Sequence, residues 1–419
     1  MRPESIPRRD ASRHCGVLGI LSWLVLLAAA AAPRLAAGAP ASRAADSLTL
    51  PVAVEPNHAL LRYTGRFDWR DPAGPRMAWS GCQVGFRFRG TAASAVLKDF
   101  ASGGPHRVRG NNDNYFNVIV DGGEPKVLSL EKGRTVYRLA EGLSAGEHTV
   151  TLFRRTEPLF QPVQFLGLQL EAGSALVAMP PRPGRLIEFI GDSITAGYGN
   201  EAADANEPFT PLTQNNYLAY GAIAARRLGA EYVCLAWSGQ GVYRDRQDKM
   251  DKVLPVLYAR SLPEDASSLH DPNAYHPDAV VINLCTNDFA TSIPPKEDFL
   301  KAYRGLVDTV HRQHPRAHVF CAVGPMMYDG APPPAGMGLT TIRAWLTELA
   351  ADYAKAGRPE VHYFEFDRPP PEFGRGSNYH PSLKTHQAMA DKLAAAIAKE
   401  LGWQTAASPA AASAPAPAR

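Results

Sequence analysis

The stretch IEFIGDSITAGYG, residues 187–199, sets the architecture of the second half of this chain. It starts as an apolar strand and runs into a tight turn at Gly191 that carries Ser193. A nucleophilic serine needs to stand at the carboxyl edge of a parallel sheet, where crevices form and backbone N–H groups can face a reacting carbonyl. The same Asp-Ser pair also suits the N-cap of a helix. Taken alone, the stretch leaves both interpretations open.

A serine hydroxyl becomes a good nucleophile only when a neighbouring base takes its proton. His380 is the best candidate, because the loop SNYHPS, residues 377–382, comes directly before the last expected helix and loops at sheet edges commonly present catalytic groups. His386, farther along, is expected to be a helix residue with a structural hydrogen bond. Other histidines lie in strand, turn or helix-end contexts, where a structural role is favoured, among them His148, His270, His276, His311, His314 and His318.

Two further strand ends offer donors for the oxyanion of a tetrahedral intermediate. The segment AWSGQG, residues 236–241, follows the second apolar strand of this half, and CTND, residues 285–288, follows the third. Gly239 can offer its backbone N–H with no side chain in the way, and Asn287 can add a side-chain amide. Each segment alone has the composition of an ordinary turn or cap. Together with Ser193 they place three polar turns at one edge of one sheet, which favours catalysis.

The hydrophobic pattern divides the chain into two parts. Short alternating strands with Asp-Gly, Gly-Gly and Ala-Gly turns, and no amphipathic helix between them, predict an all-β sandwich first. After a linker at residues 179–184, apolar strands alternate with helical segments, which predicts a parallel sheet covered on both faces. The expected strands are residues 83–88, 95–98, 116–120, 149–153, 164–170, 186–190, 232–236, 279–284 and 318–323, and the expected helices are 217–228, 299–314 and 386–401.

Domain boundaries follow from these patterns. We expect a signal peptide at 1–41, a sandwich domain at 55–178, an α/β domain at 185–403 and a disordered Ala/Pro/Ser tail at 404–419. The leader has the order of a signal peptide, because arginines precede an apolar run at residues 17–32 and A-x-A sites follow it. That run approaches the length of a membrane anchor, but Pro33 interrupts the Ala-rich stretch. We therefore expect export to the periplasm or the extracellular space, with no stable membrane insertion after the leader is cleaved.

The composition narrows the classes of partner. The chain has 419 residues and a formal net charge of +3, and no run of Lys and Arg interleaved with aromatics would track a phosphate backbone. Nucleic acid is therefore not an expected partner. No His/Cys/Asp cluster has the spacing of metal ligands, so neither a metal nor an organic cofactor is expected.

Four cysteines remain once the leader, with Cys15, is removed. Cys234, Cys285 and Cys321 lie in apolar runs, which favours buried free thiols, and Cys82 is the fourth. A disulfide bridge among them is the alternative in an oxidising compartment.

The four blocks around Ser193, Gly239, Asn287 and His380, in this order, resemble the SGNH or GDSL-type hydrolases, which are named after the Ser, Gly, Asn and His of four short motifs. The resemblance implies that Ser193 is the nucleophile and His380 its base. It also implies that Gly239 and Asn287 form the oxyanion hole, in a three-layer α/β domain built on a parallel sheet.

Upstream segments extend the resemblance to carbohydrate esterase family 2. They are YTGRF at 63–67, the stretch 86–91, GEHT at 146–149, RTE at 155–157 and the junction into 187–193. Members join an N-terminal β-sandwich of jelly-roll type to an SGNH domain and remove acetyl groups from xylan and related glycans. The similarity covers roughly residues 60–400. It implies an acetylated carbohydrate as the substrate and an acetyl-Ser193 intermediate.

Two positions depart from the family pattern. Cys285 stands at the usual Gly of the third motif and is large enough to shift its loop. Ser377 stands where an Asp is common, three residues before His380, so no carboxylate is evident in that motif to orient the imidazole. The resemblance implies a Ser-His dyad whose histidine is held by a backbone carbonyl. Asp367 or Glu372 would serve instead if the loop folds back.

Three alternatives to a glycan acetylesterase remain from the same residues. A hydrolase of this type would also fit acetylated peptidoglycan, another cell-surface glycan or a lipid ester. The two departures also fit a glycan-binding protein whose catalytic machinery has decayed. The third alternative is that the sandwich binds sugar through the aromatics Trp69, Trp79 and Tyr115. For these residues, packing in the sandwich core and its turns is the favoured interpretation.

Overall fold

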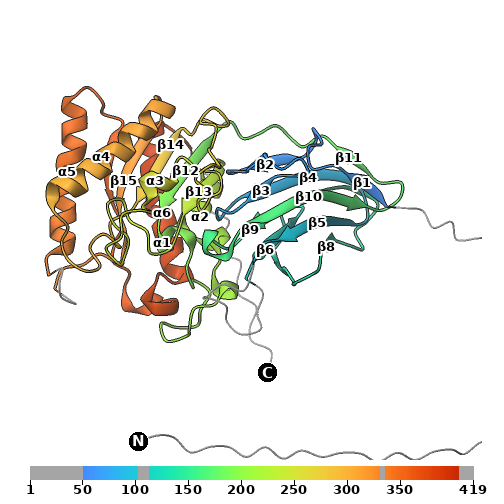
Figure 1. Cartoon of the computed structure of the whole chain (residues 1–419), viewed down its shortest axis with the longest axis horizontal. Coiled ribbons are helices and arrows are strands. Elements are labelled where there is room, and N and C mark those ends of the chain that lie inside the picture. Colours follow the sequence, from blue (N-terminus) through green and yellow to red (C-terminus); the bar gives the residue numbers. More distant parts are fainter. Residues whose placement is uncertain (1–50, 102–112, 331–335, 405–419) are drawn as a thin grey trace, which may run out of the picture. The chain divides into compact units, whose positions relative to one another are not determined.

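Two antiparallel sheets form the first half of the chain (Figure 1). The computed structural model describes residues 51–101, 113–330 and 336–404. The strands of this half are β1 Val52–Val54, β2 Arg62–Thr64, β3 Arg76–Met77, β4 Gln83–Gly90, β5 Ala93–Asp99, β6 Tyr115–Val120, β7 Lys126–Ser129, β8 Val136–Ala140, β9 Gly146–Arg154, β10 Val163–Leu170 and β11 Ala175–Val177. One sheet has the order β1-β10-β5-β8, with β3 paired to β10, and the other has the order β11-β4-β9-β6-β7, with β2 paired to β4.

Alternation along the strands builds the core of this half. In β4, Val84, Phe86 and Phe88 are fully buried, while Arg89 points outward and pairs with Glu147 at 2.7 Å. Successive side chains of a strand point to opposite faces, and burying one such apolar side chain contributes about 1.5–3 kcal/mol. The prediction of an all-β first part is confirmed. Its jelly-roll arrangement stays a prediction.

The three aromatics considered for sugar binding differ in their surroundings. Trp79 is fully buried and Tyr115 is 6% exposed, so both pack inside, as predicted. Trp69 packs edge-on against Tyr63, with ring centroids 4.9 Å apart, but 48% of it is exposed, so it lies outside the core.

A parallel sheet forms the second half, with the order β13-β12-β14-β15-β16. Its strands are β12 Leu186–Gly191, β13 Glu231–Ala236, β14 Ala279–Asn283, β15 His318–Val323 and β16 Val361–Glu365. Because β12 lies between β13 and β14, the chain moves to opposite sides of β12 in successive crossovers. The carboxyl end of such a strand is where open α/β sheets bind ligands, and Ser193 follows directly after it.

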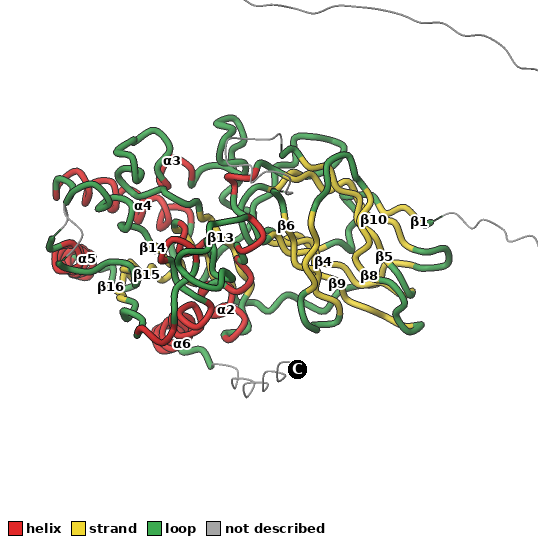
Figure 2. Tube along the Cα trace, turned by 90° about the horizontal axis from the view of Figure 1, so that it is seen from below, coloured by secondary structure: helices red, strands yellow, loops and turns green. Residues whose placement is uncertain are grey.

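Helices cover both faces of the parallel sheet (Figure 2). On one face, α2 Tyr220–Arg227 and α6 Leu383–Leu401 pack against side chains such as Phe189 and Val281. On the other face, α3 Leu254–Leu257, α4 Lys296–Gln313 and α5 Gly338–Lys355 pack against side chains such as Ile190 and Ile282. Neighbouring residues of one strand enter different cores because side chains alternate. The predicted three-layer α/β domain is confirmed.

The turn after β12 satisfies both interpretations of the Asp-Ser pair. Asp192 caps the short helix α1, Ser193–Ala196, by accepting a hydrogen bond from Ile194 N at 2.9 Å. Gly197 ends this helix with a left-handed φ of 78°. Ser193 is thus the first helical residue and also stands at the carboxyl edge of the sheet.

Element boundaries differ from the predicted ones in several places. Helix α5, strand β16 and the short strands β1, β2, β3, β7, β8 and β11 were not among the expected elements. The helix expected at 217–228 begins at Tyr220, because Ala219 is extended, and the last helix begins at Leu383 instead of His386. Short 3-10 helices occupy Pro158–Phe160, Pro211–Thr213, Asn216–Leu218, Pro371–Phe373 and Ser377–Tyr379.

A buried ion pair joins the antiparallel half to β12. Arg66 Nη2 lies 3.1 Å from Glu188 Oε1, and neither side chain is exposed. Glu188 also accepts hydrogen bonds from Tyr258 Oη at 2.9 Å and from Tyr275 Oη at 2.5 Å. Burying two charges is tolerated when further hydrogen bonds satisfy them. The described residues belong to one compact unit, and the domain boundaries expected at 55–178 and 185–403 stay a prediction.

The remaining expectations concern thiols, membranes and the chain ends. The four cysteines of the described residues are free and buried, as favoured for those in apolar runs: Cys82, Cys234, Cys285 and Cys321. No helix within residues 51–101, 113–330 and 336–404 is long and apolar enough to span a bilayer. The expected signal peptide at 1–41, with Cys15, lies outside the described residues, and so does the expected tail apart from Gln404.

Candidate active site

The structure brings Ser193 and His380 into contact across 187 positions of the chain. His380 follows the 3-10 helix Ser377–Tyr379 and precedes α6. Its Nε2 lies 2.8 Å from Ser193 Oγ, which is the distance of a hydrogen bond. A general base needs to be within this reach of the proton that it abstracts. The nucleophile and base expected from the sequence therefore have the required geometry.

Backbone carbonyls hold the other ring nitrogen of His380. Its Nδ1 lies 3.1 Å from Ser377 O and 3.3 Å from Asn378 O. Because a carbonyl only accepts, these contacts place the proton on Nδ1 and leave Nε2 to accept from Ser193.

The carboxylates considered as orienting groups lie elsewhere in the described structure. Asp367 is exposed and pairs with Lys392 at 2.6 Å. Glu372 is exposed in the 3-10 helix Pro371–Phe373. The contacts therefore favour the dyad arrangement, in which peptide groups orient the base.

Two glycines let the loop of His380 approach the turn after α1. Gly199 has a φ of 55°, and a Cβ at this position would lie 2.5 Å from Ser377 Cβ. A Cβ on Gly376 would lie 2.3 Å from Gly199 O. The approach is closed by a hydrogen bond from Ser377 N to Gly199 O at 3.1 Å. Any side chain at either glycine would push the base away from the nucleophile.

Aromatic rings cover one side of the His380 imidazole, which stays partly exposed. The Tyr198 ring lies 4.5 Å from the imidazole and stacks on Phe209 at 3.8 Å. Burial lowers the pKa of His380 to about 4, against the two carbonyl contacts, which raise it. The imidazole is therefore neutral over the physiological range and ready to accept a proton.

The expected oxyanion donors lie on two loops that meet beside the nucleophile. Asn287 Nδ2 donates to Asp192 Oδ2 at 3.2 Å and to Gln240 O at 2.9 Å. These bonds tie together the loops that follow β12, β13 and β14. Gly239 has a left-handed φ of 83°, and a Cβ there would lie 3.3 Å from the side chain of Arg246. The three polar turns thus meet at one sheet edge, as the sequence predicted.

Glu157 reaches this site from the antiparallel half. Its buried carboxylate accepts hydrogen bonds from Ser238 N and Ser238 Oγ, each at 2.6 Å. Ser238 directly precedes Gly239, so Glu157 fixes the peptide that would present the Gly239 N–H. The sequence placed Glu157 only in a family-like segment and gave it no role. No local pattern could give one, because its partner lies 81 positions away.

Buried carboxyl groups shape the loops around the dyad. Burial raises the pKa of Asp192 and of Glu157 to about 7 each, and that of Asp288 to about 6. Asp288 accepts from Tyr243 N at 2.7 Å and from Arg244 N at 3.0 Å, and these bonds oppose the rise. The three groups accept hydrogen bonds from the backbone of the loops around Ser193. None was singled out as a site residue from the sequence.

Three residues beside the site hold a left-handed backbone without being glycine. Cys285 has a φ of 125°, Asn378 of 52° and Tyr379 of 65°. Such conformations cost about 1–3 kcal/mol each and cluster at functional sites. Cys285 therefore keeps a conformation that favours the usual glycine of its motif.

Two family models match the two halves of the chain. Residues 63–180 match the carbohydrate esterase 2 N-terminal model, and residues 189–388 match the GDSL-like lipase/acylhydrolase family. With its parallel sheet and serine turn, the second half defines the protein as a GDSL-type hydrolase, a class of carboxylic ester hydrolases.

Relatives narrow the class to one family. The chain is 41% identical over 349 residues to the cellulase/esterase CelE of Acetivibrio thermocellus, which covers 83% of this chain but only 40% of that protein. It is 25% identical over 347 residues to an acetylxylan esterase / glucomannan deacetylase of Cellvibrio japonicus, covering 82% and 89%. A structure of a family two carbohydrate esterase from Clostridium thermocellum in complex with cellohexaose matches with a TM-score of 0.74 at 40% identity, over 82% of this chain and 100% of that one. The chain belongs to carbohydrate esterase family 2.

The protonation of His380 gives a direct test of its environment. We expect its imidazole to stay neutral down to about pH 5 and to titrate near pH 4, because burial disfavours the charged ring. Nitrogen-15 NMR of histidine-labelled protein measures this, and the signal that His380→Gln removes assigns the ring. A midpoint at the ordinary value of 6.5 or above would contradict the described burial.

The contact between Glu157 and Ser238 predicts a loss of turnover when it is removed. Glu157→Ala leaves the Ser238 N–H without its acceptor and frees the loop of Gly239. We expect kcat for p-nitrophenyl acetate to fall about ten- to hundredfold, which is the scale of a misplacement near 1 Å, with KM little changed. Glu157→Gln is the matched control, since its amide can still bond both atoms of Ser238. An unchanged kcat in Glu157→Ala would show that the loop holds its position without this contact.

Proposed function

We propose that this chain is an exported serine esterase that removes O-acetyl groups from a carbohydrate, of xylan type or a related glycan. The observation that carries the proposal is the 2.8 Å contact between His380 Nε2 and Ser193 Oγ. Support for the substrate comes from the relative named as an acetylxylan esterase / glucomannan deacetylase.

The first half of the reaction forms an acetyl-enzyme. Ser193 Oγ attacks the acetyl carbonyl carbon while His380 Nε2 takes the hydroxyl proton. The carbonyl oxygen becomes an oxyanion that accepts from Gly239 N–H and Asn287 Nδ2. Asn287 gives up its longer bond, at 3.2 Å to Asp192, to do so. The bond to the sugar oxygen then breaks, and this oxygen takes the proton from His380.

The second half returns the enzyme to its starting state. A water molecule attacks the acetyl carbon of acetyl-Ser193, and His380 takes a proton from that water. The same donors hold the second oxyanion. The bond to Ser193 Oγ breaks, Oγ takes the proton from His380, and acetic acid leaves and ionises in solution. Protein groups and one water supply every proton transfer in this cycle.

An exposed aromatic ring beside the dyad supports a sugar substrate. Tyr379 directly precedes His380 and is 67% exposed. Its loop is held by a hydrogen bond from Asn378 Nδ2 to Tyr198 Oη at 3.0 Å. A flat apolar ring can pack against the carbon face of a sugar while the hydroxyl edge stays hydrated.

The geometry supports an active enzyme over a decayed binding protein. Carbonyl oxygens replace the missing Asp as partners of His380 Nδ1. Cys285 keeps a left-handed backbone, so the loop of Asn287 remains tied to Asp192. Both departures from the family pattern are thus compensated within the site.

We also infer the organisation of the whole chain. The family matches at 63–180 and 189–388 support a sandwich domain of jelly-roll type at 55–178 and a hydrolase domain at 185–403. The arginines, apolar run and A-x-A sites of residues 1–41 support a signal peptide and a periplasmic or extracellular location. The composition of 404–419 supports a disordered tail.

Removing the nucleophile tests the proposal. We expect Ser193→Ala to lower acetate release from acetylated xylan and from p-nitrophenyl acetate by three orders of magnitude or more, on the scale of about 10⁶ known for a catalytic serine. Ser144→Ala, at an exposed turn of the antiparallel half, is the matched control and should keep full activity. Retained activity in Ser193→Ala would dispose of the mechanism.

A panel of acetylated xylan, acetylated glucomannan, acetylated peptidoglycan and a lipid ester tests the substrate class. The proposal predicts acetate release from a plant-type glycan. Release from peptidoglycan or lipid alone would keep the mechanism but overturn the substrate class.

A further inference from the structure

A cavity of about 980 Å³ opens at the edge of the parallel sheet opposite to Ser193. Its wall includes Leu186, the first residue of β12, and Glu231, the first residue of β13. Ser193 follows the other end of β12. Because β12 has six residues and a strand rises about 3.3 Å per residue, about 20 Å of sheet separates the cavity from the dyad. The cavity is therefore not part of the active site.

An exposed tryptophan forms part of this cavity. Trp69 lines it and is 48% exposed. The Tyr63 ring meets Trp69 edge-on, with centroids 4.9 Å apart at 78°, and Tyr63 is itself held by a hydrogen bond from its Oη to Pro56 O at 2.5 Å. Leu269, from the hydrolase half, also lines the cavity and is 71% exposed. The antiparallel half and the hydrolase half thus form this exposed apolar surface together, and the Tyr63 ring packs against Trp69 within it.

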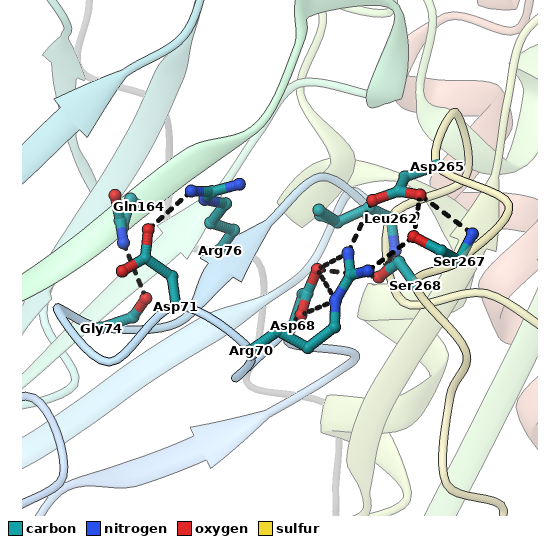
Figure 3. Close-up of polar contacts among 10 residues, drawn as sticks. All are labelled: Asp68, Arg70, Asp71, Gly74, Arg76, Gln164, Leu262, Asp265, Ser267 and Ser268. Atoms are coloured by element: carbon teal, nitrogen blue, oxygen red, sulfur yellow. Dashed lines mark hydrogen bonds and ion pairs between the residues drawn. The ribbon is translucent and has the colours of Figure 1, made fainter.

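Arg70, one of the charged residues that line the cavity, is paired with two carboxylates. Arg70 donates to Asp68 through Nε at 2.8 Å, to Asp265 through Nη2 at 2.6 Å and to Ser267 through Nη1 at 2.7 Å (Figure 3). Asp265 and Ser267 belong to the hydrolase half, so this arginine bridges the two halves. A guanidinium held between two carboxylates is largely neutralised. Asp68 is saturated, because it accepts from Arg70 N, Nε and Nη2 and from Ser268 Oγ. The side chain of Asp265 is 43% exposed, so this carboxylate can also accept from a hydroxyl group of a ligand.

A second arginine that lines the cavity also forms an ion pair and a further hydrogen bond. Arg182 forms an ion pair with Glu231 and donates to Tyr63 O at 2.8 Å. Both residues of the pair line the cavity. The cavity is lined by three arginines, Arg70, Arg182 and Arg185, and four carboxylates, Asp68, Glu231, Asp271 and Asp278. Because these charges nearly cancel, the cavity gives no strong field that would select a charged ligand.

These features fit a neutral ligand with one apolar face and many hydroxyls. Ligand sites commonly lie at domain interfaces, measure about 300–1,000 Å³ and combine an apolar surface with a few fixed polar groups. A sugar ring has an apolar carbon face that packs on an aromatic ring and a hydroxyl edge that bonds to carboxylate and guanidinium groups. The geometry points to a second glycan-binding site at Trp69, which takes a short neutral segment of the polymer that the esterase acts on. The identity of that polymer rests on the proposed function.

The second site would act by keeping the polymer near the enzyme. Binding one segment at Trp69 raises the local concentration of the remaining chain at the dyad. The effect depends on polymer length, so a small acetyl ester gains nothing from it. Removal of Trp69 should therefore separate polymer binding from the chemistry at Ser193.

Fluorine NMR locates the binding event. The probe ligands are xylohexaose and cellohexaose, added to full-length Ser193→Ala protein labelled with 5-fluorotryptophan. The chain has six tryptophans, and the signal lost in Trp69→Phe belongs to Trp69. We expect this signal to shift saturably with at least one of the two hexasaccharides.

Affinity electrophoresis in gels that contain acetylated xylan or acetylated glucomannan measures how strongly the protein binds the polymer. In the Ser193→Ala background, Trp69→Ala should weaken polymer binding about fivefold to tenfold, the scale of one aromatic contact. Trp69→Phe should retain most of it. Val127→Ala removes another exposed apolar side chain, 51% exposed on β7 and outside the cavity, and should have no effect.

Two results would overturn the second site. They are a Trp69 signal that neither hexasaccharide moves, and a polymer affinity that Trp69→Ala leaves unchanged. In the chain with Ser193, Trp69→Ala should hydrolyse p-nitrophenyl acetate within about twofold of the parent rate, as expected when chemistry and remote binding are independent. Absence of hydrolysis in the parent itself would contradict the esterase proposal only, since the glycan titrations use protein that lacks Ser193.

Discussion

Close contact between two loop backbones brings His380 to Ser193, and the rest of the proposed site depends on it. The loop before α6 can rest on the turn after α1 only because Gly199 and Gly376 lack side chains, since a Cβ on either would overlap the opposite loop. This approach sets Ser377 O beside His380 Nδ1, which fixes the ring and its tautomer. Nε2 then faces Ser193 Oγ. The proposed dyad needs no carboxylate, because backbone carbonyls orient the His380 ring.

The antiparallel half contributes directly to the hydrolase half. Arg66 is buried against Glu188, a residue of the strand that leads into the nucleophile turn. Breaking a buried ion pair by removing one partner typically costs about 3–5 kcal/mol, so this contact holds the two halves together. Glu157 accepts from Ser238, next to the Gly239 N–H. The first half therefore holds the loop of Gly239, the proposed oxyanion donor, and also forms part of the cavity at Trp69.

The architecture and the dyad could be predicted from the sequence because their signals are local. The apolar run of β12 marks a strand buried on both faces, and the turn at Gly191 marks the serine. Helix α5 was missed although its buried residues recur at helical spacing, namely Ile342, Leu346, Leu349 and Tyr353. Strand β16, at the sheet edge, buries only Val361 and Phe364 among its five residues and gives a weaker signal than the central strands.

Buried charges and the exposed tryptophan could not be predicted in the same way. Carboxylates and guanidinium groups are usually on the surface, so nothing near Glu157 or Arg66 in the sequence indicates that each finds a partner in the other half. Trp79 is fully buried and donates its indole N–H to Arg260 O at 3.2 Å, whereas Trp69 is 48% exposed, and the segments around them in the sequence do not distinguish the two.

The central claim is that His380 activates Ser193, and a fluorophosphonate probe tests it most directly. Reaction of the full chain with the probe, followed by peptide mapping by mass spectrometry, identifies the modified residue and the rate of its modification. We expect one adduct, on Ser193, formed about 10²–10⁴-fold more slowly in His380→Gln, which is the usual contribution of a general base. An adduct on a different residue, or an equal rate in His380→Gln, would contradict it.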